Sequence, residues 1–321
     1  MAERILNVYS KSITSPWLFD DLKMHFQKLD LKGIRIITSQ YPDQNADAWI
    51  AIRTTEAILS PNVEKTVVCI HDLYDHDNIY QPNGLRGIVH KVKGLVLCHP
   101  DQKKILLRNG VSITNKNILE RPIGALSAFH PGSNKPEKFT IAWIGRNHWR
   151  KRISWFIKAI QQLELPKTEF KIILLGKGIE ESGAFLQSLG FNCEIYPKEN
   201  YPITTYPNLY RKMNCLVITS STEAGPLTLF ESLATGKPVI STKVGWAPII
   251  DVGNTEAITL VDTPLEISKA IKALYLKNKR DFYNPDEISR LMNDYTLEDW
   301  IKEVVALAYS LITKTEMVSL E

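Results

Sequence analysis

The chain has 321 residues, of which 44% are hydrophobic and 23% are charged, and its formal net charge is +4 at pH 7. These values are typical of a globular protein and argue against a disordered chain, and the length favours two domains over one. The small excess of positive charge does not favour a nucleic acid as a partner.

Short apolar runs recur through the first half of the chain and predict strands. They lie at residues 4–9, 34–38, 48–52, 66–70 and 94–98. The stretches between them are long enough for crossover helices, the first of which would be opened by Pro16. Strands that are apolar throughout and alternate with helices are typical of a parallel sheet covered on both faces.

A polar stretch with two prolines and a glycine, HPGSNKPEK at residues 130–138, is the best candidate for a linker. Beyond it the alternation begins again, and a helix predicted from about Thr296 ends the chain. Further strand-like runs lie at residues 139–145, 171–176, 193–196, 215–220, 238–242 and 257–261.

The expected fold is therefore α/β, with two tandem Rossmann-like doubly wound domains that face a cleft. The N-terminal domain is predicted at residues 1–132 and the C-terminal domain at 139–294, followed by a helix and tail at 295–321. Ligands of such sheets bind beyond the carboxyl ends of the strands, and two such domains would hold a ligand between them.

The sequence shows neither the pattern of a secretion signal nor that of a membrane span. The stretch MAERILNVYSK lacks the basic and long apolar regions of a signal, and no apolar run is long enough to cross a bilayer. Cys69, Cys98, Cys193 and Cys215 form no CxxC pair and lie in or beside apolar runs, which favours small core residues over metal or disulfide roles. We therefore expect a cytoplasmic protein.

Residues 220–241 contain two glutamates, Glu223 and Glu231, between two predicted strands. A helix opened by Pro226 would be apolar on nearly every face, so the carboxylate of Glu231 needs a hydrogen-bonding partner there. A sugar diol and a basic side chain in the core are the two alternatives. Glu223 lies in the preceding loop, either beside a bound phosphate or sugar or in solvent.

The start of this predicted helix suits an oxyanion. Gly225 permits a close approach of the backbone, and the amides of Leu227 and Thr228 are among the donors that the first turn leaves unpaired.

A basic loop, IGRNHWRKRISW at residues 144–155, directly follows the first predicted strand of the C-terminal domain. It carries Arg146, Arg150, Lys151 and Arg152. Basic runs are often solvated faces, but a position after the carboxyl end of a strand is where cations meet a pyrophosphate.

These features together resemble the nucleotide-binding domain of retaining GT-B glycosyltransferases of the family-4 type, over about residues 139–262. That family has a Glu-x7-Glu motif, whose spacing Glu223 and Glu231 match, and a Gly-Arg followed by a lysine, which Gly145, Arg146 and Lys151 match.

The resemblance implies roles for these residues. Arg146 and Lys151 would contact the donor pyrophosphate, Glu231 would hold the donor ribose, and Glu223 would lie beside the donor sugar. Amides that follow Gly225 would contact sugar or phosphate.

In the first half, VVCIHDL at residues 67–73 resembles the segment that carries the family's strand-end histidine. The resemblance implies that His71 lies near the transferred sugar and orients it or assists proton movement. The segment at 120–132 resembles the family's approach to the linker.

The sequence departs from the family at three places. SKSITS at residues 10–15 replaces a Gly-rich loop, Arg152 stands where a glycine is common, and GWAPII at 245–250 lacks a second glycine and a glutamate. These departures leave the sugar contacts at the first and third places open.

Two clusters allow other interpretations. His71, Asp72, Asp75, His76 and Asp77 form a short run of potential metal ligands, for which a polar loop is the alternative. The basic residues Lys91, Lys93, Lys103, Lys104 and Arg108 suit either a solvated face or contact with an anionic membrane surface.

The resemblance implies a hexosyltransferase-type enzyme that transfers a sugar from a nucleoside-diphosphate sugar, with retention and with neither a metal nor a cofactor. The acceptor would be a glycan, a lipid-linked molecule or a small molecule, in surface glycan or glycoconjugate synthesis, in the cytoplasm or at the inner face of the membrane. Two alternatives are a non-catalytic nucleotide-sugar or carbohydrate binding protein and a metal-dependent hydrolase that uses residues 71–77.

Overall fold

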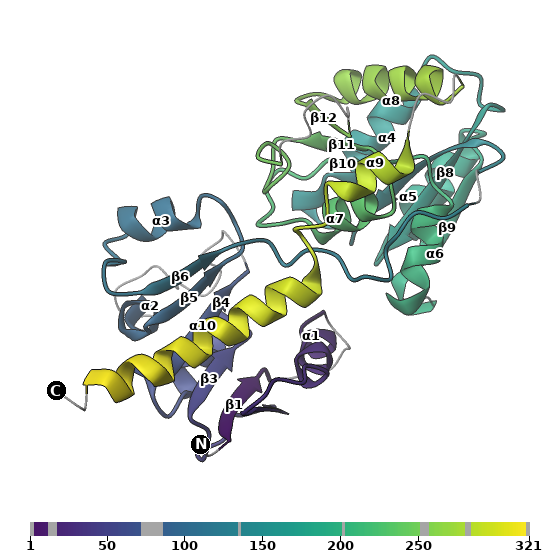
Figure 1. The fold of residues 1–321 in the computed structure, drawn as a ribbon. Coiled ribbons are helices and arrows are strands. Elements are labelled where there is room, and N and C mark those ends of the chain that lie inside the picture. Colours follow the sequence, from purple (N-terminus) through teal and green to yellow (C-terminus); the bar gives the residue numbers. More distant parts are fainter. Residues whose placement is uncertain are drawn as a thin grey trace. The chain divides into compact units, whose positions relative to one another are not determined.

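A computed structural model describes residues 3–11, 18–71, 86–133, 136–200, 203–250, 257–279 and 284–318. The chain forms two compact units (Figure 1). Unit 1 contains Met1–Ile123 and Leu297–Glu321, and unit 2 contains Gly124–Thr296. Each unit holds a six-stranded sheet in which every pair of neighbouring strands is parallel. The predicted α/β class with two doubly wound sheets is confirmed.

The sheet of unit 1 has the strand order β2-β1-β3-β4-β5-β6. Its strands are β1 (Arg4–Tyr9), β2 (Ile34–Ser39), β3 (Ala48–Ala51), β4 (Thr66–Ile70), β5 (Gly94–Leu97) and β6 (Asn117–Glu120). Every residue of β3, β4 and β5 is buried, because helices cover both faces of a parallel sheet. The helices of this unit are α1 (Leu18–Gln27), α2 (Arg86–Lys91), α3 (Gln102–Arg108) and α10 (Leu297–Val318).

The last helix, α10, crosses the sheet of unit 1 and contacts five of its strands (Figure 1). Trp300 on this helix is fully buried and meets the ring of Phe26 edge-on, with 6.1 Å between the ring centroids. Helix α10 is therefore part of the core of unit 1.

The sheet of unit 2 has the strand order β12-β11-β10-β7-β8-β9. Its strands are β7 (Phe139–Ile144), β8 (Phe170–Gly176), β9 (Cys193–Pro197), β10 (Cys215–Ile218), β11 (Val239–Thr242) and β12 (Ile258–Val261). Its helices are α4 (Ile153–Gln161), α5 (Glu180–Ser188), α6 (Tyr206–Arg211), α7 (Leu227–Ala234), α8 (Pro264–Asn278) and α9 (Pro285–Arg290).

The chain passes from unit 1 to unit 2 between Ile123 and Gly124, before the predicted linker at residues 130–138. Ala125 forms a bridge with Thr296, and the ring of Phe129 packs edge-on against Tyr210 at 5.2 Å. These contacts attach the segment before the polar stretch to unit 2, although its composition gives no sign of that attachment.

The four cysteines are buried and free. Burial raises the pKa of Cys98, Cys193 and Cys215 to about 12, so their thiols stay protonated at neutral pH. No helix among the described residues is long and apolar enough to cross a membrane.

Candidate functional site

The switch point of unit 2 lies between β7 and β10, which are neighbours at the centre of the sheet. From β7 the chain continues to one side of the sheet, through β8, and from β10 it continues to the other side, through β11. The loops that leave the two strands therefore diverge at their carboxyl ends, which is the usual ligand-binding place of an open α/β sheet. The basic loop and the loop of Glu223 are these two loops.

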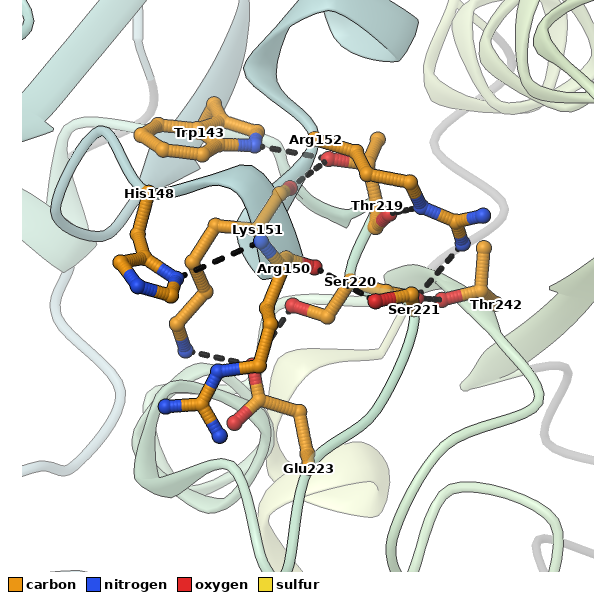
Figure 2. Close-up of polar contacts among 10 residues, drawn as sticks. All are labelled: Trp143, His148, Arg150, Lys151, Arg152, Thr219, Ser220, Ser221, Glu223 and Thr242. Atoms are coloured by element: carbon orange, nitrogen blue, oxygen red, sulfur yellow. Dashed lines mark hydrogen bonds and ion pairs between the residues drawn. The ribbon is translucent and has the colours of Figure 1, made fainter. Parts of the chain in front are cut away.

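Lys151 and Glu223 form an ion pair across the switch point, with 2.5 Å between Lys151 Nζ and Glu223 Oε1 (Figure 2). The hydroxyl of Ser220 donates to the same carboxylate oxygen at 2.6 Å. The Lys151 side chain is 27% exposed and that of Glu223 is 15% exposed, so a ligand can reach both groups while the surrounding protein limits their motion.

The backbones of the two loops are also joined directly. The hydroxyl of Thr219 donates to the carbonyl of Lys151 at 2.6 Å, and the amide of Ser221 donates to the carbonyl of Arg150 at 2.7 Å (Figure 2). Trp143, at the end of β7, donates from its indole nitrogen to the Thr219 hydroxyl at 3.0 Å. This network fixes the two loops against each other.

Arg152 is the one non-glycine residue with a positive φ in the part of the chain that the structure describes, with φ 49° and ψ 50°. A left-handed conformation costs a residue with a Cβ about 1–2 kcal/mol, which explains why a glycine is common at this position of the family that the sequence resembles. The guanidinium donates from Nε to the carbonyl of Thr219 and from Nη2 to that of Ser220, both at 2.7 Å. It also lies 3.8 Å from the ring centroid of Trp155.

Gly145 and Arg146 begin the basic loop. The amide of Gly145 donates to the carbonyl of Leu175 at 2.9 Å, and Arg146 is exposed. Gly176, which ends β8 with φ 153°, approaches this loop so closely that a Cβ would lie 1.8 Å from the Gly145 carbonyl oxygen. Only glycine at position 176 lets the loop pass over the end of β8.

Helix α7 begins at Leu227, and Pro226 is the residue before it rather than its first residue. Pro226 has an extended backbone and provides no side-chain cap. Gly225, Leu227 and Thr228, the predicted donor-binding positions, are partly buried at this helix start.

Glu231, on α7, is partly buried, and burial raises its pKa from 4.5 to about 7. The hydroxyl of Tyr210 donates to Glu231 Oε2 and lowers that pKa. A tyrosine of the protein itself is thus a partner of this carboxylate, whereas the sequence suggested a bound diol or a basic side chain. Nothing in the sequence pattern links Tyr210, on α6, to Glu231.

His71 directly follows β4 in unit 1. Its Nε2 lies 2.7 Å from the carbonyl oxygen of Ile52, which only accepts, so Nε2 carries the proton. Its Nδ1 lies 3.5 Å from the sulfur of Cys98, and its ring centroid is 6.3 Å from that of Trp300. The other members of the predicted metal cluster, residues 72–77, lie outside the described residues, and the residues that are described contain no group of three metal-binding side chains.

The chain is similar to known glycosyltransferases in sequence and in structure. Residues 138–277 match the family described as Glycosyl transferases group 1. A lipopolysaccharide 1,6-galactosyltransferase of Escherichia coli (strain K12) is 28% identical over 145 residues, which cover 43% of this chain and 40% of that protein. The chain thus matches less than half the length of this curated relative.

Solved structures resemble the chain over nearly its whole length. HepE of Anabaena, in complex with UDP and glucose, has a TM-score of 0.73 at 12% identity, over 96% of this chain and all of that chain. WaaG, a glycosyltransferase involved in lipopolysaccharide biosynthesis, has a TM-score of 0.67 at 14% identity, over 94% of this chain and 99% of its own. The fold is that of the GT-B glycosyltransferases.

Proposed function

We propose that the chain is a glycosyltransferase that moves a sugar from a nucleoside-diphosphate sugar to an acceptor hydroxyl, with unit 2 as the donor-binding unit. The pair of Lys151 and Glu223 at the switch point carries this proposal, because it lies within the segment that matches a glycosyltransferase family. An ammonium beside a carboxylate suits a ligand with a diphosphate and sugar hydroxyls, since the first pairs with phosphate oxygens and the second accepts from hydroxyls.

In the proposed reaction the bond between the anomeric carbon and the diphosphate oxygen breaks, and the diphosphate leaves with the electron pair. Lys151, Arg146 and the first-turn amides of Leu227 and Thr228 stabilise the negative charge that develops on the diphosphate. The acceptor oxygen bonds to the anomeric carbon, and its proton passes to the leaving diphosphate. Retention is implied by the resemblance and belongs to the proposal.

The two glutamates have different tasks in this proposal. Glu231 holds the donor ribose, with the Tyr210 hydroxyl orienting the carboxylate through Oε2. When the donor binds, the Lys151 ammonium leaves Glu223 and pairs with the diphosphate. The hydroxyls of the transferred sugar then donate to Glu223, which positions the sugar. Gly145 and Gly225 let the backbone approach the donor closely.

The proposal includes neither a metal ion nor a cofactor. The acceptor would be a glycan, a lipid-linked saccharide or a small molecule, in the synthesis of a surface glycan or glycoconjugate. The name of the Escherichia coli relative supports a lipopolysaccharide-like acceptor. The reaction would then take place in the cytoplasm, at the inner face of the membrane.

A thermal-shift screen against UDP-, GDP-, dTDP- and ADP-sugars tests the donor class, because a ligand at about 100 times its Kd stabilises the folded state by about 2.7 kcal/mol. The donor that binds is then incubated with the protein and acceptors. Hydrolysis or transfer of its sugar would show an enzyme, and the absence of both would show a non-catalytic binding protein.

Glu231→Ala is expected to lower donor affinity at least about tenfold in a calorimetric titration, since the ribose loses a charged acceptor. Glu169→Ala is the matched control, because Glu169 also accepts from a tyrosine, Tyr275, at 2.7 Å but lies at the amino end of β8, away from the carboxyl ends of the strands. Equal affinities of wild type and Glu231→Ala would refute this role of Glu231.

A further inference from the structure

Arg152 connects the two loops of the switch point in a way that neither a glycine nor a lysine reproduces. Its guanidinium binds two consecutive carbonyls at the end of β10, those of Thr219 and Ser220, at 2.7 Å each. Each of these two residues in turn holds one member of the ion pair. The Thr219 hydroxyl donates to the carbonyl of Lys151, and the Ser220 hydroxyl donates to Glu223 Oε1.

The left-handed backbone at Arg152 separates two neighbouring cationic side chains. Figure 2 shows that Lys151 and Arg152 leave the loop in opposite directions, Lys151 toward Glu223 and Arg152 toward the end of β10. The planar guanidinium has donors spaced for two acceptors, and stacking on Trp155 fixes its plane. The side chain thus stabilises a backbone conformation that a residue with a Cβ rarely adopts.

We propose that Arg152 is a positioning residue that sets the placement of Lys151 for the diphosphate and of Glu223 for the transferred sugar, by attaching the loop after β7 to the carbonyls at the end of β10. This inference rests on the proposed function and extends it to a residue that does not itself touch the donor. Where a glycine would adopt the left-handed conformation freely, Arg152 adopts it because its guanidinium donates to two carbonyls.

Arg152→Gly tests the proposal, because glycine adopts the left-handed conformation without strain while the side chain and its guanidinium are removed. We expect UDP affinity to fall about tenfold in calorimetry while UMP affinity changes less than about twofold, since Lys151 pairs with the diphosphate in the proposed mode and UMP has a single phosphate. We also expect kcat of donor turnover to fall more than KM rises, because the displaced ammonium stabilises the leaving group. Lys158→Ala removes an exposed cation from the neighbouring helix α4 and is expected to behave as wild type.

Hydrogen exchange at the Ser221 amide reports on the loops without any ligand, because this amide donates to the carbonyl of Arg150. Arg152→Gly is expected to accelerate this exchange about tenfold or more. Arg152→Lys, which keeps the charge but lacks the planar fork, is expected to lie between wild type and Arg152→Gly in both measurements.

The outcomes separate the two proposals. If wild type binds neither UDP nor another nucleoside diphosphate, the proposed function fails, and the exchange of Ser221 still decides whether Arg152 joins the loops. If UDP binds and Arg152→Gly leaves its affinity, kcat and the Ser221 exchange unchanged, the positioning role is overturned. Wild-type behaviour of Arg152→Lys would overturn the two-point attachment.

Discussion

The switch points of the two units differ in what their glutamates bind. In unit 1 the switch point lies between β1 and β3, and Glu56, which follows β3, reaches the loop after β1. Glu56 Oε1 accepts from the backbone amide of Lys11 at 2.7 Å and from the Ser10 hydroxyl at 3.3 Å. In unit 2, Glu223 instead accepts from two side chains, the Lys151 ammonium and the Ser220 hydroxyl.

This difference separates a structural carboxylate from one that is suited to a ligand. Glu56 is only 7% exposed, and burial raises its pKa, with the hydrogen bond from Lys11 opposing that shift. A bond to a backbone amide fixes the path of the chain. An ion pair between side chains can be exchanged for the groups of a ligand without moving the backbone. The topology of each sheet places a carboxylate at the switch point, and the hydrogen-bond partners of that carboxylate determine whether it can bind a ligand.

The largest effect is expected from Lys151→Ala, which removes the ion pair with Glu223 in unit 2. Loss of a group that stabilises charge in the transition state typically lowers kcat by about 10²- to 10³-fold, and we expect this range for donor turnover. Lys272→Ala is the control, because it removes an ion pair of similar length, 2.8 Å to Glu164, from the outer face of unit 2. Steady-state kinetics that show less than about a threefold decrease for Lys151→Ala would contradict its place in the reaction.

The second prediction compares the removal of each of the two carboxylates. Glu56→Ala leaves the partly buried amide of Lys11 without this acceptor and is expected to destabilise unit 1 by about 1–2 kcal/mol. Glu223→Ala is expected to change the stability of unit 2 by less than about 1 kcal/mol, because its ion pair is partly exposed.

Hydrogen exchange measures each unit separately, with the amides of the buried strand β4 as probes for unit 1 and those of the buried strand β10 for unit 2. Donor affinity should show the reverse order, with a decrease for Glu223→Ala and none for Glu56→Ala. Equal stability losses in the two variants would remove the distinction between the two glutamates.

The sequence predicted the two sheets because buried parallel strands are continuous apolar runs, and all five runs marked in the first half contain strands. The strand β6 was not predicted, since none of its residues is buried and it contains polar residues at both ends. The beginning of unit 2 at Gly124 depends on packing of Phe129 and not on a loop-like composition.

At the candidate site, the sequence pointed to Lys151 and Glu223 as separate motif residues, and the structure joins them across 72 positions of the chain. The sequence did not predict three sets of hydrogen bonds, which are those of the Tyr210 hydroxyl, the Ser220 hydroxyl and the Arg152 guanidinium. Such contacts depend on the direction of single side chains, and no periodic pattern records that direction. Arg152 alone gave a signal, as a residue with a Cβ where a glycine is common.

The smallest effect is expected from Tyr210→Phe, and it depends on pH. Because burial raises the pKa of Glu231 to about 7, folding favours its protonated form, and the stability that this gives is lost as the pH rises from about 4.5 through 7. Removal of the Tyr210 hydroxyl raises this pKa further, so the variant should lose about 1 kcal/mol more at about pH 8.5 than at about pH 5.

Urea unfolding at the two pH values measures this difference in stability. Hydrogen exchange of the amides in α7 monitors the unfolding and assigns it to unit 2. Tyr275→Phe, which loses the bond to the exposed Glu169, should show a smaller dependence because solvent replaces the lost donor. If Tyr210→Phe lost the same stability at both pH values, Glu231 would keep one protonation state throughout. The Tyr210 hydroxyl would then contribute the same stability at both pH values, and the pH dependence expected from its bond to Glu231 would be refuted.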